Sequence, residues 1–199
     1  FIYVDTGAMY RAVTWKALNQ GLTPDPGQVK DVVQLAERIH IQFVPGEHGQ
    51  RVLVDGDDVT AEIRSAEVTK HVSEFARFPE IRMLLVAKQK QWAAQKGVVM
   101  DGRDIGTQVI PDAEVKVFLT ASVEERARRR LEEMAGQDEV TFEQLKAEIA
   151  KRDEMDRNRP VSPLAAAEDA VVIDSTNMTL AEVVDAILHM CRTKMDGDT

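Results

Sequence analysis

The sequence has little of what builds disulfide-rich, metal-binding or membrane proteins. It contains one cysteine, Cys191, which cannot form an internal disulfide bond. Its histidines stand singly at positions 40, 48, 71 and 189, without the spacing of metal ligands. No apolar run approaches the roughly 18 to 20 residues that span a bilayer. We therefore expect a soluble protein of the reducing cytoplasm, without a metal-ligand cluster of its own.

Positive charge is also in deficit. The 25 Lys and Arg residues face 34 Asp and Glu residues, which gives a formal net charge of −9. Such a charge disfavours nucleic acid and anionic membranes as partners, so any site for an anion must be local. With 199 residues, 44% of them hydrophobic and 30% charged, the sequence fits one compact domain with a small insertion and excludes a disordered or fibrous protein.

Short apolar runs, each followed by helix signals, predict an α/β fold. The runs cover residues 1–4, 98–100, 115–119 and 170–173. Such strands in alternation with helices indicate a parallel sheet flanked by helices on both faces. Helices are predicted over residues 7–20, 79–96, 123–134, 142–157 and 180–191, the last three beginning at capping boxes. Because a strand pattern starts at residue 1, we expect further residues upstream, and we expect the tail from Thr193 to fray.

The segment around residues 40–55 interrupts this alternation. Residues 40–44 and 51–54 are strand-like and enclose a turn at 45–49, which predicts an antiparallel hairpin inside an insertion over about residues 23–78. The acidic run 55–58 resembles a calcium loop. However, glycine at its second position and Val59 at its fifth remove needed ligands, so we interpret the run as a turn.

Two segments place polar residues where a predicted strand ends. In the first, Thr6, Gly7 and Arg11 surround the start of a helix, where free N–H groups attract anions; an N-cap Thr and a surface Arg explain the segment equally well. In the second, Asp101, Arg103 and Asp104 follow a strand, where ligands of open parallel sheets bind. A site for a phosphate and its Mg²⁺ is favoured there over a capped turn with an Arg103–Asp104 pair.

Arginines are concentrated late in the chain. Seven of the 15 arginines lie between residues 126 and 159, and Arg binds phosphate oxygens in a bidentate manner. For those at 126, 128, 129 and 130, glutamates four residues away make a solvated, salt-bridged helix an equal explanation.

The helix predicted from residue 142 has an unusual face. Its apolar positions Leu145 and Ile149 continue at the same spacing into Arg152, Asp156 and Arg159. Charges on a core-facing side need partners, which favours a ligand with anionic and hydroxyl groups over a purely structural ion pair. Pro160 is expected to unwind the last turn before Arg159.

Together these segments resemble the bacterial cytidylate (CMP) kinases, which are P-loop nucleoside monophosphate kinases. The resemblance rests on D-T-G-A-M-Y-R at 5–11, D-G-D-D-V-T-A-E-I-R at 55–64, D-G-R-D-I-G-T at 101–107, F-L-T-A-S-V-E-E-R-A at 118–127 and K-R-D-x-x-D-R-N-R at 151–159. It implies a core over residues 1–22, 97–121 and 160–199, a monophosphate-binding insertion over 23–96 with helices after the hairpin, and an arginine-rich lid over 122–159.

The resemblance also assigns roles to residues. It implies that the cytosine is bound by Ser73, Arg82 and Asp104, the CMP phosphate by Thr6, Arg11, Arg103 and Arg159, and the ribose by Arg152 and Asp156. Asp101 joins this substrate site. Arg126, Arg129 and Arg130 match the lid over ATP, and the groups implied to act on the transferring phosphate are Arg103, Arg129, Arg130 and Arg159.

The resemblance implies an ATP-dependent kinase that converts CMP, and dCMP, into the diphosphate, with Mg²⁺ accompanying ATP and a monomeric state. The sequence lacks the family's Gly-rich loop G-x-x-x-x-G-K-[ST]. We therefore expect these 199 residues alone to be inactive and, without a central strand, poorly folded. Another P-loop kinase or a non-enzymatic nucleotide-binding module are the alternatives.

Overall fold

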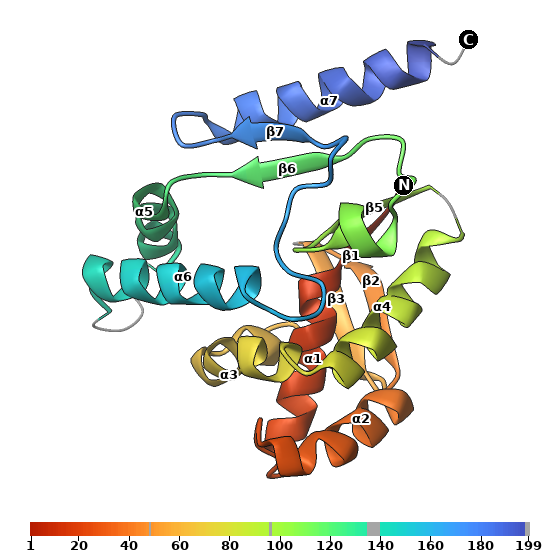
Figure 1. The fold of residues 1–199 in the computed structure, drawn as a ribbon, viewed down its shortest axis with the longest axis vertical. Helices are drawn as coiled ribbons and strands as arrows, with labels where there is room; N and C mark the ends of the chain where they lie inside the picture. Colours follow the sequence, from red (N-terminus) through yellow and green to blue (C-terminus); the bar gives the residue numbers. More distant parts are fainter. Residues whose placement is uncertain (48, 96, 135–139, 198–199) are drawn as a thin grey trace.

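Short parallel strands lie among α-helices in the computed structural model, which describes residues 1–47, 49–95, 97–134 and 140–197 (Figure 1). Strand β1 (Ile2–Asp5) pairs in parallel with β5 (Val98–Asp101), and β6 (Val117–Thr120) pairs in parallel with β7 (Val171–Asp174). The register sets Asp5 opposite Asp101 at the carboxyl ends of the first pair. The predicted α/β class and the predicted strands are confirmed.

The two strand pairs differ from the predicted single, covered sheet. Within the described residues, backbone pairing joins β1 to β5 and β6 to β7, but does not join one pair to the other. Val4 and Ile173 are buried, whereas Val99 and Val172 on the neighbouring positions are more than half exposed. A continuous apolar pattern does not report which strands are hydrogen-bonded, so the division into two strand pairs was not predictable from it.

The five predicted helices are confirmed, with ends shifted by a few residues. They are α1 (Thr6–Asn19), α4 (Pro79–Ala93), α5 (Val123–Glu133), α6 (Phe142–Arg157) and α7 (Leu180–Gly197). The caps at Ser122, Thr141 and Thr179 all accept the expected backbone N–H. Helix α7 continues to Gly197, so the predicted fraying from Thr193 is wrong; the Thr193 hydroxyl bonds to the His189 carbonyl within the helix, and Lys194 lies at its negative end.

The hairpin is present as β2 (Ile41–Gly46) and β3 (Gly49–Val54), and a short strand β4 (Asp57–Asp58) extends it. His48, in the predicted turn, lies outside the described residues. The predicted turn is present in the first half of the acidic run, where Asp55 and Gly56 have positive φ angles of 55° and 94°, and Asp57 and Asp58 form β4. The Asp55 carboxylate accepts bonds from the His40 N–H and from Lys16, and these bonds lower its pKa.

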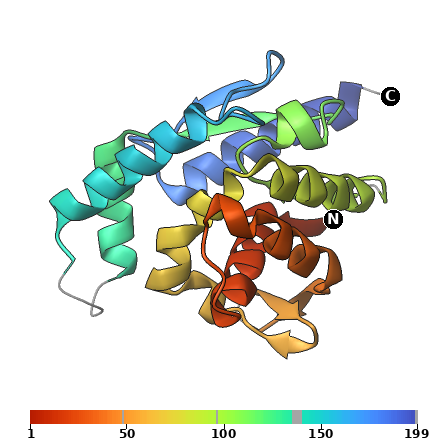
Figure 2. The same cartoon turned by 60° about the horizontal axis from the view of Figure 1, so that its bottom comes forward.

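Helix α1 is the centre of the main core. Its residues Met9, Val13 and Ala17 are fully buried against the hairpin and against α2 (Val29–Arg38), α3 (Ala66–Ala76) and α4. Figure 2 shows this group of helices above the hairpin, with α5 and α6 packed together at one end of the molecule. Short helical turns η1 (Pro26–Gln28), η2 (Glu62–Arg64) and η3 (Ile105–Val109) complete the described elements. Among the described residues, no helix is long and apolar enough to cross a membrane.

Candidate active site

Arg82 of α4 and Asp104, three residues after β5, form a buried ion pair. The Arg82 Nη2 donates to Asp104 Oδ2 at 2.5 Å, and the side chains are 2% and 5% exposed. The Arg82 Nη1 donates to the carbonyl of Ala76 at the end of α3. Ser73, one turn earlier in α3, is half-buried on the same side of that helix. The structure therefore brings Arg82 and Asp104 together, and places Ser73 on the helix that Arg82 contacts.

Asp156 of α6 is the second buried acid, and it faces two arginines. Its carboxylate lies 3.3 Å from the Arg159 guanidinium and 3.4 Å from the Nε of Arg103. Arg159 also donates to the carbonyl of Ser162, a non-glycine residue with a φ of 52°. Helix α6 ends at Arg157, two residues before Arg159, as Pro160 predicts. The prediction that the charged face of α6 turns inward is confirmed, because Asp156 and Arg159 are both buried.

Arg11 of α1 is held between α3 and η2. Its Nη1 donates to the Thr69 hydroxyl at 2.8 Å and to the Ile63 carbonyl at 3.3 Å. Burial, and then repulsion from Arg152 and Arg64, lowers the pKa of Arg11 to about 10. Arg64 itself pairs with Asp5, the N-cap residue of α1. Arg11 thus lies among other guanidinium groups, and it has neutral partners instead of a carboxylate.

Arg152 of α6 extends this arginine cluster. Burial, and then Arg103, lowers its pKa, while Asp156 and Asp153 raise it. Its buried Nε has no hydrogen-bond partner among the described residues, and the same holds for the Nε of Arg82 and Arg159. Buried donors without acceptors are costly unless a ligand completes them. The three unpartnered Nε groups therefore indicate a ligand that carries several oxygen acceptors.

The arginine cluster therefore joins distant parts of the chain. Besides burial, Arg152 and Arg64 lower the pKa of Arg11, Arg103 and Arg159 lower that of Arg152, and Arg82 lowers that of Arg159. The members come from α1, η2, α4, the loop after β5, α6 and the residues that follow α6: Arg11, Arg64, Arg82, Arg103, Arg152 and Arg159. In a chain of net charge −9, so many cations drawn together against mutual repulsion indicate a site for an anion.

The start of α1 is fastened to β5. The Thr6 hydroxyl donates to the Asp101 carbonyl at 2.6 Å, and Asp5, not Thr6, caps the helix by accepting from the Ala8 N–H. Gly102 lies so close that a Cβ there would come within 2.3 Å of the Thr6 hydroxyl. The Tyr3 hydroxyl donates to the Asp101 carboxylate. Desolvation, and then the neighbouring Asp5, raises the pKa of Asp101.

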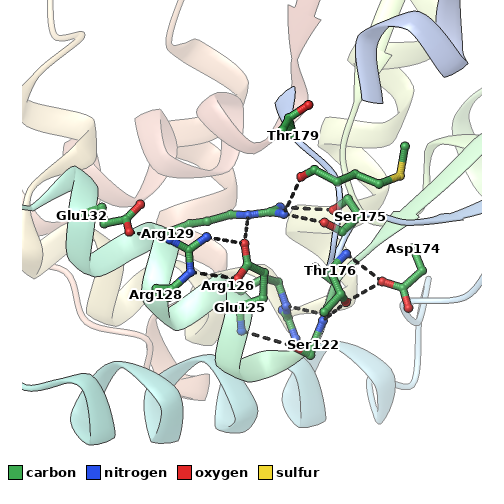
Figure 3. Close-up of polar contacts among 12 residues, drawn as sticks. Ser122, Glu125, Arg126, Arg128, Arg129, Glu132, Asp174, Ser175, Thr176 and Thr179 are labelled. Carbon is green, nitrogen blue, oxygen red and sulfur yellow. Dashed lines mark hydrogen bonds and ion pairs between the residues drawn. The ribbon is translucent and has the colours of Figure 1, made fainter. Parts of the chain in front are cut away.

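The arginines of α5 are bound mainly by protein groups (Figure 3). Arg126 makes a bidentate pair with Asp153 of α6, at 3.0 and 2.5 Å. Arg129 reaches from α5 to Ser175, the residue after β7, and donates to both of its oxygens; it also pairs with Glu125. Arg128 pairs with Glu125 and Glu132, as the salt-bridged alternative predicts. The structure does not bring these side chains to Asp104 or Asp156.

Arg130 differs from its neighbours on α5. It pairs only with Glu133 among the described residues, it remains about half exposed, and its charge contributes to the lowered pKa of Arg11. Arg130 therefore has a partly exposed guanidinium whose charge acts on the arginine cluster.

Comparison with known proteins agrees with this geometry. The family model described as cytidylate kinase matches residues 1–193. The cytidylate kinase of Oceanobacillus iheyensis is 52% identical over 95% of this chain and 82% of its own length. Those of Desulforamulus reducens and Bacillus subtilis are 54% and 47% identical, over 94% and 98% of this chain and 83% and 86% of their own lengths. The chain belongs to the cytidylate kinase family.

Sequence reasoning missed several residues that the structure places beside the arginine cluster. Arg64 stands inside the 55–64 motif but had no role assigned, and Thr69, Tyr10 and Gln89 were not singled out. Gln89 could have been found, because a polar residue lies there at the spacing of the buried positions Ile81, Arg82 and Leu85. Arg64 and Thr69 carry no local signal, since only the packing of η2 and α3 against α1 brings them to the site.

Proposed function

We propose that this chain transfers the γ-phosphoryl group of ATP to CMP, and to dCMP, and so forms the diphosphates. The arginine cluster beside the buried Asp104 and Asp156 carries the proposal, since it pairs an anion site with two acids that can accept bonds from a base and a sugar. Membership of the cytidylate kinase family supports it. The attacking phosphate oxygen is already anionic, so the reaction depends on positioning and charge neutralisation more than on a general base.

Base recognition is assigned to Ser73, Arg82 and Asp104. Cytosine presents an exocyclic amine, for which a carboxylate is a good acceptor, beside a ring nitrogen that accepts from a guanidinium or hydroxyl. The Arg82–Asp104 pair offers both types of group in a buried place, where each bond counts for more than in water. Uracil carries a carbonyl in place of the amine and would leave Asp104 facing an acceptor.

The sugar and phosphate are assigned to the neighbouring arginines. Asp156 can accept from a ribose hydroxyl, beside Arg152, whose Nε is free to donate. Arg11, Arg103 and Arg159 surround the place for the CMP phosphate, where Arg103 and Arg159 would also act on the transferring group. The Thr6 hydroxyl already donates to the backbone carbonyl of Asp101. Thr6 would therefore support phosphate binding by holding the N-terminal end of α1 in place.

The ATP side is assigned to Arg126, Arg129 and Arg130, with Mg²⁺ held by carboxylates. The described residues hold no group of three or more candidate metal ligands. Mg²⁺ in kinases commonly uses one or two carboxylates plus phosphates and water, and the adjacent Asp5 and Asp101 fit that need. The bound ion would neutralise charge on the phosphate oxygens. Arg129 and Arg130 would contact the transferring group once their bonds to Ser175 and Glu133 are exchanged.

The organisation of the chain follows the same proposal. The core comprises residues 1–22, 97–121 and 160–199, the monophosphate-binding part 23–96 and the lid 122–159. We place the protein in the cytoplasm as a monomer. These 199 residues hold no G-x-x-x-x-G-K-[ST] run, whose N–H groups, Lys and hydroxyl cradle ATP phosphates in P-loop kinases, so we expect them to bind CMP without transferring phosphate.

Calorimetric titration of the 199-residue chain with CMP, dCMP, UMP and AMP tests substrate choice. CMP and dCMP should bind at least about tenfold more tightly than UMP or AMP, because the wrong base leaves buried polar groups unpaired. Equal binding of all four nucleotides would favour a kinase of other specificity.

Activity is tested by fusing a strand and helix that carry the run G-x-x-x-x-G-K-[ST] ahead of Phe1. The fused protein should form ADP only when CMP or dCMP is present, and the unfused chain should form none. In the fused protein, Arg129→Ala should slow transfer while CMP affinity is retained. CMP binding without ADP formation by the fused protein would leave a nucleotide-binding module instead of a kinase.

A further inference from the structure

Gln89 of α4 is a buried polar side chain that neither the fold nor the assigned site explains. It is 0% exposed, and neither its amide nitrogen nor its amide oxygen has a hydrogen-bond partner among the described residues. An apolar side chain of similar size would fill the same space without this cost. The presence of an amide therefore needs a reason other than packing.

The second unpartnered group in this region is the hydroxyl of Tyr10. It too is buried without a partner among the described residues. Burial raises the pKa of Tyr10 to about 12, and the remaining influences on it come from Arg82, Asp104, Arg159 and the Gln89 amide. The Gln89 side chain is therefore close enough to the Tyr10 hydroxyl to act on it, although the two groups fall short of good hydrogen-bond geometry.

Tyr10 also contacts Arg82 directly. The Arg82 guanidinium carbon lies 5.2 Å from the centre of the Tyr10 ring. Arg82 and Gln89 are seven residues apart on α4, so they share one face of that helix. Gln89, Tyr10 and Arg82 therefore form a continuous series that ends at the carboxylate of Asp104.

We propose that Gln89 and Tyr10 are positioning residues for base selection: when CMP binds, the Gln89 amide bonds to the Tyr10 hydroxyl and fixes the ring on which Arg82 rests. The orientation of Arg82 then holds Asp104 toward the exocyclic amine of cytosine. The inference rests on the proposed function, because it concerns the residues to which base recognition is assigned. Neither side chain needs to touch the nucleotide for this effect.

The two polar groups match one another chemically. An amide oxygen can accept from the hydroxyl, or the amide nitrogen can donate to it, so a small rotation of either side chain makes a bond without any change of charge. A fixed Tyr10 ring limits the orientations of the Arg82 guanidinium. Arg82 then loses less conformational entropy when it binds the base. Discrimination between cytosine and uracil depends on this restriction more than overall nucleotide affinity does.

The test is calorimetric titration of the 199-residue chain, three single variants and the Gln89→Leu/Tyr10→Phe double variant with CMP and with UMP, alongside thermal unfolding. Gln89→Leu should lower the preference for CMP over UMP by about tenfold, the effect of one bond at the base, and should leave the unfolding temperature unchanged or raised. Tyr10→Phe, which removes one oxygen and keeps the ring, should lower the same ratio. Gln91→Leu, an exposed glutamine on the same helix, should change neither quantity.

The outcomes separate this inference from the proposed function. A wild-type preference for CMP that survives unchanged in both Gln89→Leu and Tyr10→Phe overturns the positioning role alone. An equal loss of affinity for CMP and UMP also overturns it, because it indicates a general packing role. Absence of any preference for CMP in the wild-type chain overturns the proposed function and this inference together. In the double variant, a loss no greater than in either single variant supports one connected series.

Discussion

The guanidinium of Arg82 and the carboxylate of Asp104 are joined at 2.5 Å in a place where both side chains are nearly without solvent contact. The pair links α4 to the loop after β5, two segments 22 positions apart in the chain. Since each charge has been removed from water, each depends on the other for its compensation.

Asp104→Asn should therefore be strongly destabilising. It leaves the buried Arg82 without a counter-charge, and we expect the free energy of unfolding in urea to fall by about 3–5 kcal/mol. Arg51→Gln, which breaks the exposed Arg51–Asp58 pair, should have a small effect and serves as the control. An equal loss of stability in the two variants would show that the Arg82–Asp104 pair is exposed to solvent.

Arg152→Met should separate binding from stability. Methionine keeps an unbranched apolar side chain but removes a buried cation whose Nε has no acceptor among the described residues and which is repelled by Arg103. The unfolding temperature should rise, while CMP affinity should fall by about 10- to 100-fold, the loss of a charge-assisted hydrogen bond to the ligand. Calorimetry and thermal unfolding measure the two effects. Unchanged CMP affinity would remove Arg152 from the site.

Gly102→Ala should disturb the junction of β5 and α1. The new Cβ would fall within 2.3 Å of the Thr6 hydroxyl and 2.9 Å of the Ile105 side chain, so the bond from Thr6 to Asp101 must break or lengthen. We expect a loss of about 1–3 kcal/mol in unfolding free energy. Gly106→Ala is the matched control, because its Cβ would have ordinary contact with Lys116 at 3.4 Å. Equal stability in both variants would contradict the close approach.

Arg126→Gln should loosen α5 from α6. It removes the bidentate pair with Asp153, whose carboxylate is 8% exposed, and should cost about 1–3 kcal/mol. Hydrogen exchange should become faster in both helices. Arg128→Gln, on the exposed face of α5, should leave exchange in α6 unchanged. Faster exchange in α6 with Arg128→Gln but not with Arg126→Gln would show that the helices are joined by other contacts.

The carboxyl of Asp101 gives a pH-dependent prediction. Desolvation and Asp5 raise its pKa, Arg103 and the bond from Tyr3 oppose the rise, and Arg64 pairs with Asp5 beside it. A raised pKa means that the folded chain binds this proton more tightly than the unfolded chain, so the group's contribution to stability is present below its ordinary pKa and is lost as the pH rises through the raised value. Asp101→Asn should therefore gain stability relative to wild type in urea unfolding as the pH rises above the ordinary carboxyl pKa of about 4. A difference that shrinks as the pH rises would show the opposite shift.

Local patterns predicted the helices and the hairpin well, because capping boxes, Pro79 and glycine stops are local signals. The change from Leu145 and Ile149 to Arg152 and Asp156 on one face of α6 likewise predicted buried charge, since burial of that face is set by helix geometry. The pairing of the parallel strands was not predictable in this way. Apolar strands carry no mark of which neighbour they bond to.

The contacts of individual site residues were harder to predict when the partner lies far away in the sequence. Arg82 and Asp104 are joined as the motifs suggest, but Thr6 bonds to a backbone carbonyl and Arg129 to Ser175, contacts between segments 95 and 46 positions apart. Helix α2 was not predicted, although its buried positions follow a helical spacing, because the strand pattern at 40–54 is the stronger signal in that part of the sequence. Contacts between distant segments arise from packing, which a single sequence does not record.

Exposed apolar side chains on the two strand pairs should promote self-association at high protein concentration. Ile2, Val99, Leu119 and Val172 present apolar surface beside strand edges, a combination that attracts strands from other molecules. Self-association during purification should therefore start at these strands instead of at the hairpin, and light scattering should report less of it after Val99→Thr and Val172→Thr. Self-association of this chain would then depend on exposed hydrocarbon, whereas nucleotide binding would depend on buried charge.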